Sequence, residues 1–308
     1  MKKRPIRSMV PMAVAGALAV ASPAGAVPLL GSDLASFTVL GASTVTNVPS
    51  SAITGNVGVW SSGGANAITG FNSAPGVAVA DGQVTAGQVH AGTALAESAQ
   101  GQLTRGITNL GSLGPGTALT NPDLSGLTLS PGVYTVPAGP TNLSGALTLD
   151  GQGNANAAWV FQMPSTLITS PNSVVDLINS GSGAGVFWNV GSSATIDSNT
   201  TFLGNILALS SITMNSTATD LCGRALASTG AVTLSQNTLS GSCLGVLSGS
   251  GGLGGGLDVV TAADGSTVIG SLPFAAVDGA AGTVPEPGTL ALMGLGLAGL
   301  LFRRRRHG

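Results

Sequence analysis

The sequence predicts a mostly β protein whose short strands wind into a solenoid. Of its 308 residues, 48 are glycine, 43% are hydrophobic and only 4% are aromatic. Small residues in this proportion favour many short strands joined by tight turns, and they argue against a helical bundle or an ordinary α/β enzyme. In addition, short motifs recur about every 20 residues, which is typical of a solenoid whose turns stack on one another.

The repeats place threonine between apolar residues. Residues 124–129 (LSGLTL) recur at 143–149 (LSGALTL), and similar triplets follow at 194–196 (ATI), 212–214 (ITM) and 232–234 (VTL). Side chains alternate between the two faces of a strand, so if the flanking residues point inward, each threonine points outward. Stacked coils would then carry threonine in a row, although threonine is also a common residue on any strand surface.

One segment, residues 89–110, predicts a helix instead. Alanine, leucine, glutamate and glutamine replace the β-forming residues there. Three glycines weaken this helix, so we expect it to need the side of the solenoid for support. Its apolar residues recur every fourth position, at Leu95, Ala99, Leu103 and Ile107.

Both ends of the chain carry targeting signals. Residues 1–26 have a basic start, an apolar run and a small-residue cleavage site, as in a secretory signal peptide. The C-terminus has Pro285, Glu286 and Pro287, then an apolar run over 288–302, then Arg303, Arg304, Arg305 and Arg306. It resembles the PEP-CTERM sorting signal of Gram-negative bacteria, which implies transient anchoring in the inner membrane and removal by an exosortase-type processing enzyme. We therefore expect an exported protein that is secreted or held at the cell surface.

The charge between the two ends disfavours nucleic acid as a partner. Only Arg105 and Arg224 stand against eleven acids from Asp33 to Asp278, a net charge of −9. A body without a basic patch cannot neutralise phosphates.

The residues also argue against an enzyme. No lysine lies outside the signal peptide, and His90 is the only histidine between the two targeting signals, which leaves almost no material for a catalytic triad or a histidine metal site. Asp176, Asp197 and Asp220 lie about one coil apart and could stack into an acidic ladder. Turn or exposed-strand positions are the preferred interpretation for them. We expect neither a metal nor a cofactor.

The two cysteines, Cys222 and Cys243, are also about one coil apart. In an exported protein they favour a disulfide between neighbouring coils over a pair of free buried thiols. Beyond them, residues 245–283 are rich in glycine and serine and predict a flexible stalk, in which 257–272 could form a hairpin. The predicted organisation is thus a signal peptide (1–26), a solenoid (27–244), a stalk (245–283) and a sorting signal (284–308).

An ordered series of motifs runs over about residues 30–240, at 30–41, 53–59, 89–91, 129–134, 149–153, 160–162, 186–195 and 202–208. This series is similar to the ice-binding-like adhesins, the large microbial family of ice-binding proteins. The resemblance implies a three-sided parallel β-solenoid with one long α-helix along its side. It also implies that the N-terminal segment packs among later coils.

Ice-binding members of that family adsorb to ice, or to ordered water, through one flat face rich in Thr, Ser and Ala. The Thr-Ala/Gly-x-Thr/Asn repeats of potent members are largely missing here, so we expect weak or moderate activity. The alternative is a surface or biofilm-matrix adhesin that binds exopolysaccharide without catalysis. The residues expected to contact ice are Thr128, Thr148, Thr195, Thr213 and Thr233, with Thr217 and Thr219 as an adjacent alternative.

Overall fold

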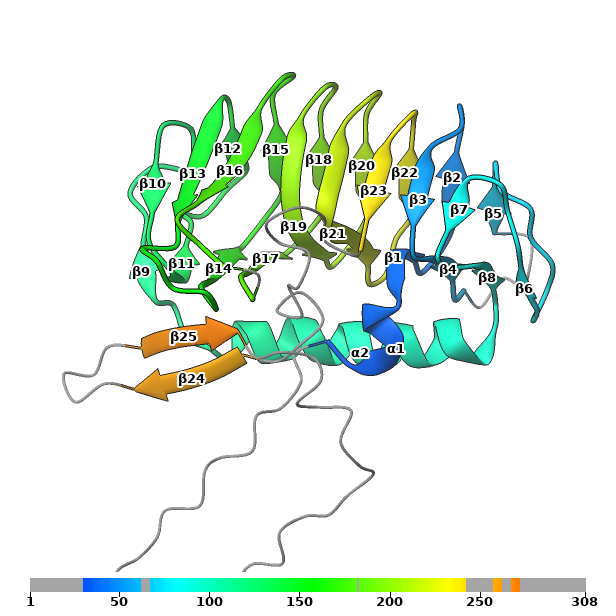
Figure 1. The fold of residues 1–308 in the computed structure, drawn as a ribbon, viewed down its shortest axis with the longest axis horizontal. Coiled ribbons are helices and arrows are strands. Elements are labelled where there is room, and N and C mark those ends of the chain that lie inside the picture. The colour runs from blue at the N-terminus through cyan, green and yellow to red at the C-terminus, as the bar shows by residue number, and fades with distance from the viewer. Residues whose placement is uncertain (1–29, 62–66, 182, 242–256, 262–266, 272–308) are drawn as a thin grey trace, which may run out of the picture.

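The computed structural model describes residues 30–61, 67–181, 183–241, 257–261 and 267–271, and these form a three-sided solenoid flanked by a helix (Figure 1). Each coil passes through three faces, which we name the covered face, the mixed face and the threonine face. Within the solenoid the named strands pair in parallel, except that β6 pairs antiparallel with β8 at one end. The predicted fold class is confirmed.

The covered face lies beside the long helix. It follows the order β6 (Ala78–Val79), β8 (Val89–Ala91), β4 (Asn56–Val59), β1 (Phe37–Gly41), β21 (Thr219–Ala227), β19 (Thr201–Ala208), β17 (Gly185–Val190), β14 (Ala158–Met163), β11 (Gly132–Thr135) and β9 (Thr117–Ala118).

In the described part of the chain, α-helices pack on the covered face and not on the other two faces. The mixed face comprises β10 (Thr128–Leu129), β13 (Ala146–Asp150), β16 (Val174–Ile178), the first residues of β19 and β21, β23 (Thr238–Ser240), β3 (Ala52–Thr54) and β7 (Val84–Thr85). The threonine face is a separate sheet of β12 (Thr141–Leu143), β15 (Leu167–Thr169), β18 (Ala194–Ile196), β20 (Ile212–Met214), β22 (Val232–Leu234), β2 (Val45–Asn47) and β5 (Ile68–Thr69).

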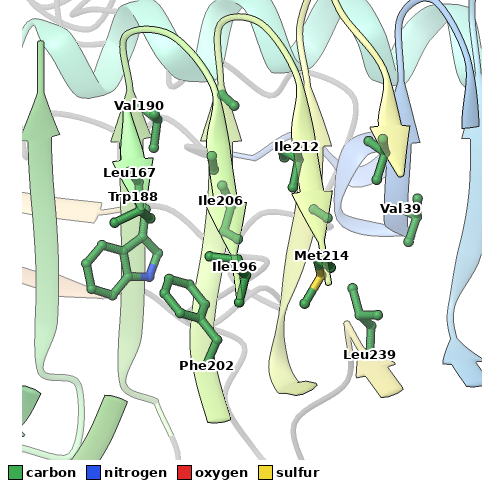
Figure 2. Close-up of a cluster of buried hydrophobic side chains, with 14 of the residues drawn as sticks. Val39, Leu167, Trp188, Val190, Ile196, Phe202, Ile206, Ile212, Met214 and Leu239 are labelled. Carbon is green, nitrogen blue, oxygen red and sulfur yellow. The ribbon is translucent and has the colours of Figure 1, made fainter. Parts of the chain in front are cut away.

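The core runs along the inside of the solenoid and takes side chains from all three faces (Figure 2). Ile196 and Met214 come from the threonine face, Trp188 from the covered face and Phe202 from the mixed face, and all four are buried. Aromatic rings stack from coil to coil, with 4.3 Å between the ring centroids of Phe161 and Trp188. Successive coils can therefore stack, because each inward apolar side chain meets another apolar side chain in the next coil.

The order of the coils does not follow the sequence. β1, β2 and β3 lie directly beside β21, β22 and β23, so the first coils of the chain pack against the last ones. In Figure 1 the blue N-terminal strands accordingly lie next to the yellow ones. This arrangement, which the family resemblance implied, leaves the chain at one end of the solenoid after β8.

The helix α2 (Ala94–Gly111) returns the chain to the other end, where β9 begins. Its length is about 27 Å at 1.5 Å per residue. Its buried side packs on outward residues of the covered face such as Phe187 and Leu207. A second helix, α1 (Ser32–Ala35), contributes Leu34 to the same cluster.

The predicted helix began too early. Val89–Ala91 form β8, and α2 starts only after Thr93, whose side chain accepts a hydrogen bond from the N–H of Ala96. Gly92 has φ +64°, a left-handed conformation that ends the strand and permits the turn into the cap. His90, which lies within the segment predicted as helix, is therefore on a strand.

The C-terminal predictions fall mostly outside the described residues. The hairpin expected at 257–272 is present as β24 (Leu257–Thr261) and β25 (Thr267–Ser271), which pair antiparallel. Residues 1–29 and 272–308, with the signal peptide and the sorting signal, are not described. Among the residues that are, no helix is long and apolar enough to cross a membrane.

Candidate functional site

Five threonines form one row across the threonine face. Thr195 lies opposite Thr213, Thr213 opposite Thr233, Thr233 opposite Thr46, and Thr46 opposite Thr69. They occupy five successive parallel strands, so their spacing along the row is that of the strands, about 4.8 Å. We name this row the threonine ladder.

The ladder points outward because its neighbours along each strand point inward. On β20, for example, Ile212 and Met214 are buried while Thr213 between them is partly exposed. On β18, β20, β22 and β2 the threonine lies between two buried residues, and on β5 the residue before it, Ile68, is buried. The inward residues beside each threonine therefore set its outward direction.

A second row runs beside the ladder, two residues earlier in the chain and directly before each strand begins. The hydroxyl oxygen of Ser193 accepts a hydrogen bond from the N–H of Ser211, and that of Ser211 accepts one from the N–H of Ala231. These bonds join consecutive coils and restrict the serine side chains. The second row consists of Ser193, Ser211, Ala231, Thr44 and Ala67, so both rows contain only Thr, Ser and Ala.

The ladder stops at one end on an apolar residue. Ile168 on β15 lies opposite Thr195 and is 40% exposed, and Asn142 follows on β12. Asp197 stands at the border of this face, where it accepts hydrogen bonds from Asn215 and from the N–H of Ser198. These bonds lower the pKa of Asp197, so its carboxylate stays charged beside the ladder rather than within it.

The predicted threonines do not lie on one face. Thr195, Thr213 and Thr233 belong to the ladder, but Thr128 and Thr148 pair with each other on the mixed face. The next residue in their row is Asp176.

Thr219 and Thr217 lie elsewhere again. Thr219 is in another row of the mixed face, between Thr201 and Thr238. Thr217 occupies the turn between the threonine face and the mixed face, with φ +63°, and its hydroxyl donates to the side-chain oxygen of Asn199.

Sequence reasoning missed two members of the ladder, Thr46 and Thr69. Residues 45–47 (VTN) carry the same signal as the later triplets, an apolar residue before a threonine. They were missed because β2 and β5 come from the N-terminal coils, which lie outside the period of 20. Only the non-sequential stacking of coils brings them into line with Thr233.

The mixed face is less regular than the threonine face. It exposes Leu221 (45%) and Ile178 (43%), and it carries the charged Asp176. The pairing of β19 with β21 also shifts register between Phe202 and Gly204. Its longest threonine row is therefore shorter than the ladder: Thr201, Thr219 and Thr238 lie in register, and Val174 and Ala52 bound them.

Comparison with known proteins agrees with this geometry. The sequence pattern of the ice-binding-like family matches residues 39–240. The chain belongs to the ice-binding-like family. It is 43% identical to an ice-binding protein of Nostoc sp. (strain HG1), over 71% of this chain and 76% of that protein. An ice-binding protein of Flavobacterium frigoris (strain PS1) is 30% identical, over 67% of this chain and 74% of the relative.

Solved structures of ice-binding proteins share the fold. The ice-binding protein of the Antarctic ascomycete Antarctomyces psychrotrophicus has a TM-score of 0.57 at 32% identity, covering 68% of this chain and 96% of its own. LeIBP from an Arctic yeast has a TM-score of 0.61 at 26% identity, covering 68% and 92%. In addition, the PEP-CTERM protein-sorting motif matches residues 283–306, so the family domain is followed by a signal for export and sorting.

The acidic ladder considered for this ice-binding-like chain does not form. Asp176 is exposed on the mixed face, Asp197 lies at the border of the threonine face, and Asp220 is fully buried inside the solenoid. The reason is the alternation along the strands: Asp220 pairs with the inward-facing Phe202 and Leu239, whereas Asp176 pairs with the outward-facing Thr148. In the part of the chain that the structure describes, no group of acidic, histidine or cysteine residues could hold a metal ion.

Burial dominates the chemistry of Asp220. It raises the pKa of this carboxyl to about 7, against the opposing effects of the Cys222 and Gly204 N–H groups and of Arg224. Arg224 is buried too, and its guanidinium donates to Asn205 and to the carbonyl of Ala35. Asp220 and Arg224 thus belong to the interior and not to a surface site.

The remaining prediction in this region concerns the cysteines. Cys222 is buried on β21. Cys243 lies outside the described residues, so the pairing of the two stays a prediction.

Proposed function

We propose that this chain is an exported protein that adsorbs to ice through its threonine face. The observation that carries the proposal is the threonine ladder, five threonines in register on five adjacent strands. Each threonine presents one methyl and one hydroxyl group at a fixed spacing. Such a surface can hold water in an ordered layer that joins the ice lattice.

Rigidity supports the proposal. Four of the five ladder strands are paired on both sides, and the edge strand β5 is paired on one. Hydrogen bonds accepted by the hydroxyl oxygens of Ser193 and Ser211 also link successive coils. A β-branched side chain on a strand also has few rotamers. An already ordered face loses little entropy when it adsorbs, so more of the contact energy remains as binding.

The absence of charge from the two rows also supports this assignment. A carboxylate orients water strongly around itself, which works against an ice-like layer. The threonine face keeps its acid, Asp197, at the border, whereas the mixed face has Asp176 next to Thr148. We therefore assign ice binding to Thr195, Thr213, Thr233, Thr46 and Thr69, and not to Thr128, Thr148, Thr217 or Thr219.

We infer that the chain acts by binding and not by catalysis. His90 is buried against the ring of Phe37, and its Nδ1 lies 3.2 Å from the hydroxyl oxygen of Thr93. Burial lowers the pKa of His90, which favours the neutral ring of a structural residue. We also infer that residues 1–26 are removed on export and that an exosortase-type enzyme processes the sorting motif.

Tyrosine substitutions on two faces test the proposal. The double variant Thr213→Tyr, Thr233→Tyr places two large rings in the middle of the ladder. The matched control, Thr128→Tyr, Thr148→Tyr, makes the same change at two adjacent positions of the mixed face. Tyrosine is favoured on strands, so both variants should fold.

Thermal hysteresis and inhibition of ice recrystallisation are measured on the purified exported chain, with circular dichroism as the check on folding. We expect the ladder variant to lose both activities and the control to keep them. A folded wild-type chain without either activity would overturn ice binding and favour the exopolysaccharide adhesin. Equal activity in the ladder variant would overturn the assignment of the face.

A further inference from the structure

The chain leaves the solenoid after β23, at the corner between the covered face and the mixed face. The last described residue of the domain is Gly241, directly after β23. Its N–H lies 3.1 Å from both the hydroxyl oxygen of Thr38 on β1 and the carbonyl oxygen of Thr54 on β3. Since β1 belongs to the covered face and β3 to the mixed face, the chain leaves at the corner between them.

This corner lies opposite the threonine face. β19 crosses it without a turn, because Thr201 pairs with the mixed-face strand β16 while Asn205 pairs with the covered-face strand β17. The threonine face is reached only through turns at the two other corners. In a three-sided solenoid, the corner shared by two faces points away from the third.

The same corner is reinforced from inside. The buried guanidinium of Arg224 donates from Nε and Nη2 to the carbonyl oxygen of Ala35, at 3.2 and 2.8 Å, and from Nη1 to Asn205. These bonds connect the N-terminal helix α1 to the coils of β19 and β21. The N-terminal helix α1 and the exit of the chain at Gly241 are therefore both hydrogen-bonded at this corner.

The strand that precedes the exit is not at an end of the stack. β23 pairs with β21 on one side and with β3 on the other. A pull on Gly241 is therefore resisted by neighbours on both sides, whereas an edge strand would be held on one side only. An attachment here can carry a load without opening an end of the solenoid.

We propose that the chain works while attached to the cell through its C-terminal side, and that it holds the cell against a solid ice surface. The inference rests on the proposed function and on the sorting motif at residues 283–306. A tether that starts at the corner behind the threonine face leaves that face unobstructed for contact with ice. Many tethered copies then contact one ice surface, and multivalency gives strong retention even where each contact is weak.

The test uses cells that naturally produce the chain. Wild-type cells are compared with cells carrying the ladder variant Thr213→Tyr, Thr233→Tyr and with cells carrying the control Thr128→Tyr, Thr148→Tyr. Antibody labelling of intact cells measures the chain at the surface, and immunoblots measure the share in the medium. Cells that remain on an ice surface after washing are then counted.

We expect most of the chain on the cells, and retention of wild-type and control cells on ice. The ladder variant should lower retention about 100-fold at equal surface labelling, since multivalent contacts gain or lose binding by factors of 10²–10⁴. A chain found mainly in the medium, or equal retention of the ladder variant, would overturn the proposal. Failure of ice binding itself is recognised separately, because the purified wild-type chain would then lack thermal hysteresis.

Discussion

Thr233 on β22 and Thr46 on β2 lie directly opposite each other, although 187 positions separate them in the sequence. This pair joins the two parts of the threonine ladder. Thr195 and Thr213 continue the row on one side, and Thr69 continues it on the other. A continuous face is therefore produced by inserting the first coils of the chain after the last ones.

The first prediction concerns Thr46, which lies in the ladder between Thr233 and Thr69. Thr46→Tyr should lower thermal hysteresis as much as Thr213→Tyr does, because both place a ring within the row. The free energy of unfolding should change by about 0.5 kcal/mol or less, as is usual for surface positions. Measured hysteresis close to that of the wild-type chain would show that the N-terminal coils do not take part in ice contact.

The second prediction is a gain of activity at Ile168. Ile168→Thr would extend the ladder to a sixth strand with another β-branched side chain, so thermal hysteresis should rise. Ile178 on the mixed face is exposed to nearly the same extent and gives a matched control. Ile178→Thr should leave hysteresis unchanged, and a similar rise in both variants would contradict the assignment of the face.

The third prediction concerns the pH dependence of stability. In the unfolded chain the carboxyl of Asp220 has its ordinary pKa near 3.8, and burial raises it to about 7 in the folded chain. Between these values the folded state keeps a proton that the unfolded state has lost. The contribution of Asp220 therefore stabilises the fold at low pH and is lost as the pH rises from about 4 to about 7.

Asp220→Asn removes this titration. The difference in the free energy of unfolding between wild type and variant should fall between pH 4 and pH 8 by up to roughly 4 kcal/mol, at about 1.4 kcal/mol per pKa unit. Comparing the two chains cancels the opposite effect of His90, whose lowered pKa costs stability as the pH falls below about 6.5. Urea unfolding across this range measures the difference, and a constant difference would contradict the raised pKa.

The fourth prediction separates stability from ice binding. Thr93 caps α2 by accepting a hydrogen bond from the N–H of Ala96. Thr93→Ala should lower the free energy of unfolding by about 1 kcal/mol. Thermal hysteresis below the melting temperature should stay unchanged, since the helix covers a different face. A loss of hysteresis in the folded variant would show that the covered face contributes to ice contact.

Much of the fold could be predicted because it depends on local patterns. Triplets such as 212–214 (ITM) determine which residue enters the core, and the period of 20 predicts the stacking of coils. The start of α2 was misplaced because Gly92 and Thr93 act through backbone conformation and capping, which a stripe of apolar residues does not reveal.

The candidate site could be predicted only in part. Outward threonines were recognised from their neighbours, but the face of each depends on where the coil turns. Thr148 and Thr195 share a local pattern and lie on different faces, while Asp220 lies in the inward row of Phe202 and Asp176 lies in an outward row. Such features follow from the packing of coils against one another and not from any single repeat.

The most direct test of the central claim compares two threonines of the same coil. Thr213 lies in the ladder and Thr219, six residues later, lies on the mixed face. Adsorption to ice is measured for the folded variants Thr213→Tyr and Thr219→Tyr by the fraction of protein that partitions into slowly grown ice. We predict that Thr213→Tyr is excluded from the ice while Thr219→Tyr enters it like the wild-type chain. Exclusion of Thr219→Tyr alone, or equal partition of both variants, would contradict the claim that the threonine ladder binds ice.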